Sequence, residues 1–164
     1  MLDIRSAVDR QFSDLFARLM GFNVVRPFLD FTVYAKAVGK GRPRLTTRGV
    51  YAHAYTPAKT REFETLVSWS AKRAMCQRSP VASGHALFVQ ITASLAPPLS
   101  WSKKRRSEAF GAFCSKKPDT DNVAKAILDA MNGIVYEDDA QVVGLIVQKF
   151  YAEENEINIK VFTV

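Results

Sequence analysis

The segment from Pro118 to Asp139 constrains the fold more than any other part of the sequence, because it encodes one short helix with defined ends. The proline at its start disfavours helical backbone just before it. Asp121 or Asn122 can cap the helix N-terminus, and apolar residues follow at helical spacing as far as Met131. Asn132-Gly133 then ends the helix. The chain can therefore turn back after this helix.

Six of the sixteen acidic residues of the chain lie in this segment. Asp119 and Asp121 are two residues apart before the helix, where extended backbone projects alternate side chains to the same side. A short extended piece after the helix is expected to bring Glu137, Asp138 and Asp139 back within reach of the first pair. Carboxylates at short separation raise one another's pKa unless a cation offsets their charge.

These carboxylates predict a site for one divalent cation, with Asp119, Asp121, Asp138 and Asp139 as candidate ligands. Oxygen ligands suit Mg²⁺, for which Mn²⁺ can substitute, and such an ion can activate water and polarise a phosphodiester. Lys125 lies one turn into the helix, where an ammonium can neutralise a phosphate or a leaving oxygen. Two simpler interpretations remain open: Asp121 is only a helix cap, and residues 137–139 are only a polar turn. For Asp129 a surface role and a ligand role are both open.

The basic residues are concentrated in a different part of the chain. Residues 31–118 carry 16 Lys and Arg against three Glu, whereas residues 119–164 carry three basic and nine acidic side chains. A dense basic surface attracts polyphosphate, so DNA or RNA is the expected partner, although ordinary solvated side chains are the simpler alternative. The candidate nucleic-acid-binding residues are Lys40, Arg42, Arg44, Arg48, Lys103, Lys104, Arg105, Arg106, Lys116 and Lys117.

Hydrophobic patterning predicts an α+β domain. Phe28–Ala37 and Ala86–Leu95 read as strands, and the β-rich segments Val142–Tyr151 and Ile157–Val164 are expected to pair as an antiparallel hairpin. Residues 39–49, rich in glycine and arginine, are expected to form a flexible surface loop.

Two further helices are predicted before the acidic segment. A long helix begins at Thr56-Pro57 and runs to about Gln77, with Trp69 expected in the core although stacking on a base is an alternative. A short helix capped by Ser100 carries the four consecutive basic residues 103–106.

The chain length and its 48% apolar content suit one domain with its own core. Residues 3–20 predict an amphipathic helix, which with its connector forms an N-terminal unit, residues 1–26, ahead of the main domain, residues 27–164. That helix is expected to pack on the core or on another subunit rather than on a membrane. With no apolar run of the roughly 20 residues that a membrane span needs, a cytoplasmic protein is expected.

The motif Lys117-Pro-Asp-Thr-Asp-Asn-x-x-Lys125, followed by Asn132-Gly-Ile-Val-Tyr-Glu-Asp-Asp-Ala-Gln141, resembles the RusA-type Holliday junction resolvases. The resemblance is strongest over residues 116–143 and extends to residues 39–48, 55–64 and 98–106, whereas the N-terminal helix lies outside the family pattern. It implies a RusA-like domain with a mixed or antiparallel sheet of about four strands and helices packed on it.

The resemblance also implies the chemistry. It makes Asp119, Asp121 and Asp139 the catalytic Mg²⁺-binding carboxylates, Lys125 the catalytic lysine, and Asp138 a supporting acid. Family members resolve four-way DNA junctions as homodimers by paired symmetric nicks, act in recombination and repair, and are commonly carried by prophages. Two alternatives remain: a nuclease for other branched DNA, such as forks or flaps, and a noncatalytic DNA-binding protein.

Overall fold

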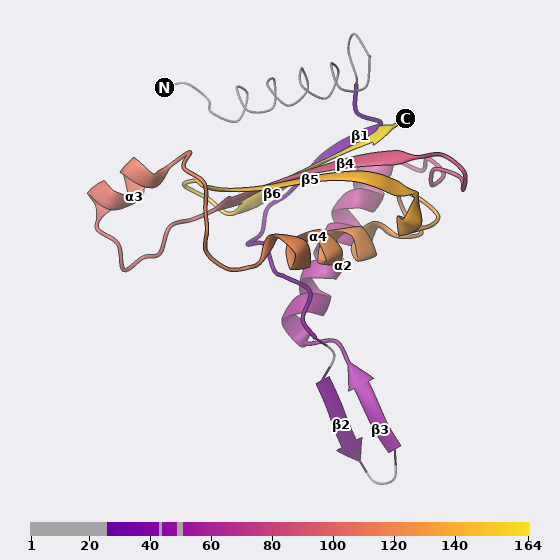
Figure 1. The fold of residues 1–164 in the computed structure, drawn as a ribbon, viewed down its shortest axis with the longest axis horizontal. Helices are drawn as coiled ribbons and strands as arrows, with labels where there is room; N and C mark the ends of the chain where they lie inside the picture. Colours follow the sequence, from indigo (N-terminus) through magenta and orange to yellow (C-terminus); the bar gives the residue numbers. More distant parts are fainter. Residues whose placement is uncertain (1–25, 43, 49–50) are drawn as a thin grey trace.

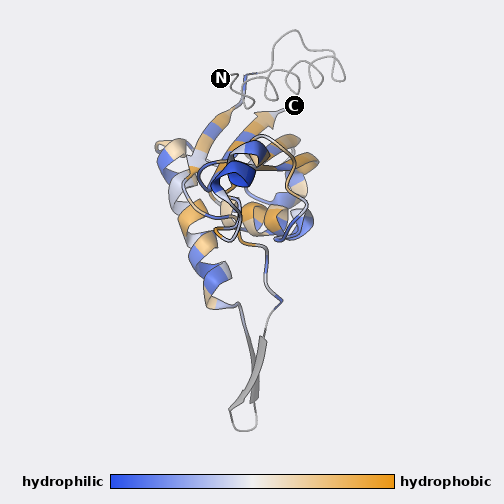
Figure 2. Ribbon diagram, turned by 90° about the vertical axis from the view of Figure 1, so that its left-hand side faces the viewer, coloured by the Kyte–Doolittle hydropathy of each residue, from blue (hydrophilic) through white to orange (hydrophobic). Residues whose placement is uncertain are grey.

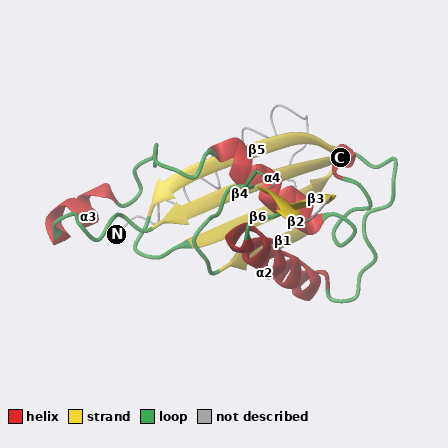
Figure 3. Cartoon of the chain, turned by 90° about the horizontal axis from the view of Figure 1, so that it is seen from below, coloured by secondary structure: helices red, strands yellow, loops and turns green. Residues whose placement is uncertain are grey.

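The computed structural model describes residues 26–42, 44–48 and 51–164 of the chain. The predicted helix over residues 3–20, and almost all of the predicted N-terminal unit 1–26, lie outside these residues. In the described part, a four-stranded mixed sheet forms one layer, and α2 (Ala58–Met75) and α4 (Thr120–Met131) cover one face of it (Figures 1 and 3). The predicted α+β class with about four sheet strands is confirmed.

The sheet has the strand order β1 (Leu29–Val33), β6 (Glu156–Thr163), β4 (Leu87–Leu95), β5 (Val142–Tyr151). β4 pairs in parallel with β5 and antiparallel with β6, and β6 also pairs antiparallel with β1. The expected hairpin of β5 with β6 is therefore wrong, because β4 lies between these two strands.

The connection between β5 and β6 explains how neighbouring strands in sequence become separated in the sheet. Residues 152–155 pass the end of β4, where the Ala152 amide donates to the Leu95 carbonyl at 3.0 Å. The side-chain oxygen of Asn155 accepts from the Ala96 amide, also at 3.0 Å. The loop thus bonds to the end of β4 itself, which lets β5 and β6 take the two sides of that strand.

A second, separate sheet replaces much of the expected flexible loop. β2 (Arg44–Arg48) and β3 (Tyr51–Tyr55) form a two-stranded antiparallel hairpin, with Arg44 opposite Tyr55. It extends away from the main sheet beyond α2 (Figure 1). The loop prediction was wrong over these residues, because the β-favouring Thr46 and Thr47 outweigh the glycines on either side. The first strand is also shorter than predicted and ends at Val33.

The long helix α2 is confirmed within two residues at each end, and Pro57 occupies its N-cap position. α2 buries Phe63, Val67, Ala71 and Met75 at a spacing of four residues. Trp69 is 72% exposed, so the prediction that it belongs to the core is wrong. Trp69 lies two residues from both Val67 and Ala71, which places it on the opposite side of a helix with 3.6 residues per turn.

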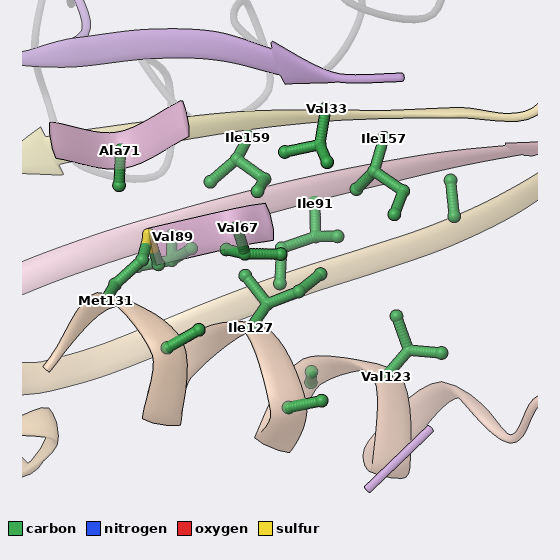
Figure 4. Packing of buried hydrophobic residues seen from close by; sticks show 14 of the residues in the cluster. Val33, Val67, Ala71, Val89, Ile91, Val123, Ile127, Met131, Ile157 and Ile159 are labelled. Atoms are coloured by element: carbon green, nitrogen blue, oxygen red, sulfur yellow. The ribbon is translucent and has the colours of Figure 1, made fainter. Parts of the chain in front are cut away.

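The core lies between the sheet and these two helices (Figure 4). Ile91, Ile157 and Ile159 point from the sheet toward Val67 of α2 and Ile127 of α4, and all five are fully buried. The same face of α4 buries Val123, Ala124, Ala126, Ala130 and Met131. This packing fixes how α4 lies on the sheet, and so where each end of the helix points.

Replacing Ile127 with alanine should destabilise the fold by about 2–5 kcal/mol, because it removes buried methylenes and leaves a cavity between α4 and the sheet. Urea unfolding followed by circular dichroism measures the change. Leu99→Ala is the matched control, since Leu99 is 85% exposed and its truncation should change stability by less than about 0.5 kcal/mol. Equal effects in the two variants would contradict this description of the core.

Candidate active site

Two of the predicted ligands lie at the N-terminal end of α4. Asp119 occupies the N-cap position with extended backbone, and its carboxylate makes no capping hydrogen bond. Asp121 lies in the first turn, and both residues are exposed. This corrects the expectation that Asp121 or Asn122 is the cap. A helix N-terminus favours negative charge, so the backbone supports two carboxylates at this position.

Lys125 follows Asp121 by four residues and is also exposed. Residues at this spacing lie on the same face of a helix. The buried side chains of α4 lie on its other face, against the sheet. One exposed surface of α4 therefore carries the carboxylate of Asp121 and an ammonium one turn further along.

A lysine of the edge strand holds the chain just before Asp119. The Nζ of Lys149, in β5, donates to the carbonyl of Lys116 at 2.8 Å and to that of Pro118 at 2.7 Å. The Cys114 amide donates in turn to the Lys149 carbonyl at 2.8 Å. Sequence reasoning missed Lys149. The available signal was a lysine inside a largely apolar strand pattern.

The acidic turn after α4 is organised around Gln141, which sequence reasoning also missed. Asp138 is the N-cap of the short 3-10 helix η1 (Asp139–Gln141) and accepts from the Ala140 amide at 2.8 Å. The side-chain oxygen of Gln141 accepts from the amides of Glu137 and Asp138, at 3.1 Å each. Its amide group donates to the carbonyls of Ala82 and His85 at 2.8 and 3.2 Å. The signal was the Asp-x-x-Gln spacing of a capping box.

The three acidic residues of this turn have different environments. Glu137 accepts hydrogen bonds from the amide and the hydroxyl of Ser83, and these bonds lower the pKa of its carboxyl group. Asp138 caps η1. The Asp139 side chain is exposed, and its charge, after the larger effect of burial, contributes to raising the pKa of Tyr136. The Tyr136 hydroxyl donates to the Leu128 carbonyl at 2.8 Å, which attaches the turn to α4.

The predicted ligands therefore come from the two ends of one helix. In the described part of the chain, no three or more Asp, Glu, His or Cys side chains lie close enough together to hold one ion. Among the described residues, the expected group of three or four carboxylates around one cation is therefore not seen. The ligand roles of Asp119, Asp121, Asp138 and Asp139 stay predictions.

The basic helix α3 (Lys103–Ala109) projects at one end of the sheet, away from α2 and α4 (Figure 1). Its cap is Ser102, which accepts from the Arg105 amide at 3.3 Å, and not Ser100 as predicted. Lys103, Lys104 and Arg105 are exposed, and the helix is strongly hydrophilic (Figure 2). The Arg105 guanidinium lies 4.1 Å from the centroid of the Trp101 ring, so α3 is anchored by an aromatic contact while Lys103 and Lys104 face solvent.

The other predicted DNA-binding residues differ in environment. Arg42, Lys116 and Lys117 are exposed, and Arg106 is half-buried. Lys40 lies between two carboxylates, those of Glu64 and Asp129. The side chains of Arg44 and Arg48 lie outside what the structure describes. The DNA-binding roles of these residues stay predictions.

Comparisons with known proteins place the chain in a class. Residues 35–162 match the family described as "Endodeoxyribonuclease RusA". The chain is also 34% identical over 138 residues to the "Uncharacterized protein YqaN" of Bacillus subtilis (strain 168), a match that covers 81% of this chain and 94% of that protein. The protein is thus an endonuclease that acts on DNA. It belongs to the RusA endodeoxyribonuclease family, which confirms the family resemblance. None of the described helices is long and apolar enough to cross a membrane.

The bonds from Ser83 to Glu137 predict a pH dependence of stability. Because the folded pKa of Glu137 lies below its ordinary value of 4.5, its contribution is fully present above pH 4.5 and is lost as the pH falls through the lowered value. The Glu137→Gln variant should lack this acid-sensitive contribution to stability. Thermal unfolding at intervals between pH 7 and pH 3 measures it. Glu153→Gln, at an exposed carboxylate in the β5–β6 loop, should keep the native profile. A native profile in Glu137→Gln would contradict the assignment.

Proposed function

We propose that this protein is a divalent-metal-dependent endonuclease that cuts four-way DNA junctions, acting as a homodimer that makes paired symmetric nicks. The observation that carries the proposal is the exposed surface at the start of α4. It presents Asp119, Asp121 and Lys125 directly after the basic segment that ends at Lys117, in a chain whose family is one of endodeoxyribonucleases. Recombination and repair, the processes that consume such junctions, are the proposed context of this activity, and a prophage is the proposed genetic source.

The residues at the start of α4 fit Mg²⁺, or Mn²⁺ in its place. Mg²⁺ in phosphoryl-transfer sites is commonly bound through only one or two carboxylates, with waters and substrate phosphates as the other ligands. Asp119 and Asp121 supply that number, and no capping bond occupies Asp119. A cation bound there supplies electrostatic stabilisation of phosphate charge. Asp139, exposed beyond the other end of α4, is the proposed third catalytic carboxylate, and Asp138 a supporting acid.

The remaining chemistry falls to side chains of the chain itself. The ammonium of Lys125 lies one turn beyond Asp121 on the exposed face of α4, where it can contact the scissile phosphate and stabilise the leaving oxygen. Lys149 and Gln141 hold the backbone on either side of α4, so the carboxylates keep a fixed orientation. Positioning of this kind is a major part of phosphoryl-transfer catalysis.

The DNA path is proposed to follow the basic segments. Exposed charges on α3 and at Lys116 and Lys117 flank the approach to Asp119 along the chain, and Arg42 leads into the β2–β3 hairpin. Contacts from these residues to phosphates give affinity without sequence preference, which suits an enzyme that selects a branched shape.

The outer edge of β5 supports the proposed homodimer. β5 is the last strand in the sheet order, and in the described part of the chain only its C-terminal end pairs further, through Phe113 with Phe150. Val143 is 64% exposed and Leu145 40% on the remaining part of the strand. An apolar open edge of this kind can pair with a second chain. Two active sites at a fixed separation are what symmetric incision of a junction requires.

Asp121→Asn should reduce cleavage to background while leaving junction binding unchanged or tighter, because it removes a negative charge near the DNA. The experiment incubates native and variant protein with a labelled four-way junction, a forked duplex and a linear duplex, each with Mg²⁺ and with EDTA. Native protein should nick the junction symmetrically only when Mg²⁺ is present.

Asp30→Asn is the matched control, because it makes the same chemical change at an exposed carboxylate on β1 and should cleave normally. Preference for the fork over the junction would support a nuclease for other branched DNA. Binding with no Mg²⁺-dependent cleavage by the native protein would refute the proposed activity and favour a noncatalytic DNA-binding protein.

Val143→Lys should weaken dimerisation, because it places a charge at the open edge of β5. Sedimentation velocity should show a shift from dimer to monomer, accompanied by loss of paired nicking. Leu99→Lys, at an exposed leucine away from this edge, is the control and should remain dimeric. A dimeric Val143→Lys protein would exclude this edge as the interface.

A further inference from the structure

A short segment, Gly39–Gly41, crosses between α2 and α4, and the backbone of this crossing segment bonds to both helices. The Lys40 amide donates to the Asn122 carbonyl of α4 at 2.8 Å. The Gly41 amide donates to the Thr60 hydroxyl of α2 at 3.2 Å. The segment therefore links the two helices, and it does so at the first turn of α4, next to Asp121.

Glycine is favoured on both sides of Lys40 because the backbone approaches the helices closely. A Cβ on Gly39 would lie 3.0 Å from the Cβ of Asn122. A Cβ on Gly41 would lie 2.9 Å from Pro57 and 3.0 Å from the Thr60 hydroxyl. The close contact explains the glycines that sequence analysis assigned to a flexible loop.

The Lys40 side chain completes the link. Its Nζ lies 2.6 Å from Glu64 of α2 and 2.6 Å from Asp129 of α4, and all three side chains are largely covered, with 25%, 21% and 29% of their surfaces exposed. Burial by itself lowers the pKa of Lys40, but the hydrogen bonds to Asp129 and Glu64, together with the negative charges of these two carboxylates, outweigh burial and raise that pKa above its ordinary value. Lys40 is thus a charged residue whose ammonium already has two carboxylate partners.

These contacts hold the helix that carries the proposed catalytic residues Asp121 and Lys125. The crossing segment holds α4 at Asn122 and again at Asp129, two turns later, and Lys125 lies between these points. A phosphate that approached Lys40 would meet Glu64 and Asp129, which carry one more negative charge than Lys40 offsets. Arg42 is exposed and lies beyond the link, at the start of the β2–β3 hairpin.

We propose that Lys40 is a positioning residue that sets Asp121 and Lys125 relative to α2 and the β2–β3 hairpin, and that it does not contact DNA. This deepens the proposed nuclease function and rests on it. It predicts different effects for two nearby basic residues. Loss of the Lys40 ammonium impairs the cleavage step, whereas loss of the Arg42 guanidinium impairs DNA binding.

The experiment compares Lys40→Met, Lys40→Arg and Arg42→Ala with the native protein. Junction binding is measured by fluorescence anisotropy at several salt concentrations, with Ca²⁺ in place of Mg²⁺, and cleavage by single-turnover kinetics in Mg²⁺. Lys40→Met should retain the native affinity and salt slope but cleave about 10- to 100-fold more slowly, as expected for misplaced catalytic groups. Arg42→Ala should bind more weakly, with a salt slope reduced by about one.

A compensated variant separates positioning from general loss of structure. Lys40→Met combined with Glu64→Gln and Asp129→Asn removes every charge of the cluster, so no carboxylate is left without its partner, and cleavage should recover most of the loss. Lys40→Arg keeps the charge and should retain more activity than Lys40→Met. The proposal would be overturned if Lys40→Met bound the junction more weakly and with a reduced salt slope, as expected for Arg42→Ala. It would also be overturned if Lys40→Met cleaved the junction at the native rate.

Hydrogen exchange makes the test independent of activity. The hydrogen-bonded amides of residue 40 and Gly41, and those of α4 from Val123 to Asp129, should exchange faster in Lys40→Met than in the native protein, while those of β4 and β6 should not change. An equal increase in exchange rate across the whole protein, or no change in the rates of the α4 amides, would refute the positioning role. If the native protein does not cleave junctions at all, the proposed function fails, and the exchange result still decides whether Lys40 holds α4.

Discussion

The structure depends on burial of the apolar face of α4 against the sheet. Ile127 packs with Ile91, Ile157 and Ile159, and all of these side chains are excluded from solvent. Because this face carries no charged residue, the helix can be buried only with its other face outward. The same packing therefore turns Asp121, Lys125 and Asp129 away from the sheet, so the stability of the core and the presentation of the candidate site have one cause.

Polar networks then fix the irregular backbone at each end of α4, where apolar packing cannot specify a conformation. Lys149 binds the carbonyl of Pro118 before the helix, and Gln141 binds the amides of Glu137 and Asp138 after it. Lys149 belongs to β5 and Gln141 to η1 directly before it, so this segment and the helix are joined at both ends. Lys40 adds a link from α2 on the outer side.

Local patterns predicted elements more reliably than they predicted contacts. The bounds of α2, α4 and β4 follow from periodicity and from flanking proline, asparagine and glycine, which act within a few residues. The pairing of β5 with β6 was mispredicted because adjacency in sequence favours a hairpin, while the bonds of Ala152 and Asn155 to the end of β4 are contacts between distant residues. Trp69 was assigned to the core from composition alone, without regard to its angle around α2.

The sequence alone determined the family, the helix that carries Asp121 and Lys125, and the separation of basic from acidic segments, since all three are written in consecutive residues. Only the tertiary structure decided which charges are available to a ligand. The sequence does not distinguish Lys40 from Arg42, because both are basic residues of one segment. In the structure, Lys40 lies between two carboxylates and Arg42 is exposed. Glu137, Asp138 and Asp139 likewise form one acidic run, and the first bonds to Ser83, the second caps η1, and the third remains exposed. The availability of a charge depends on partners brought from elsewhere in the chain, and no local pattern encodes them.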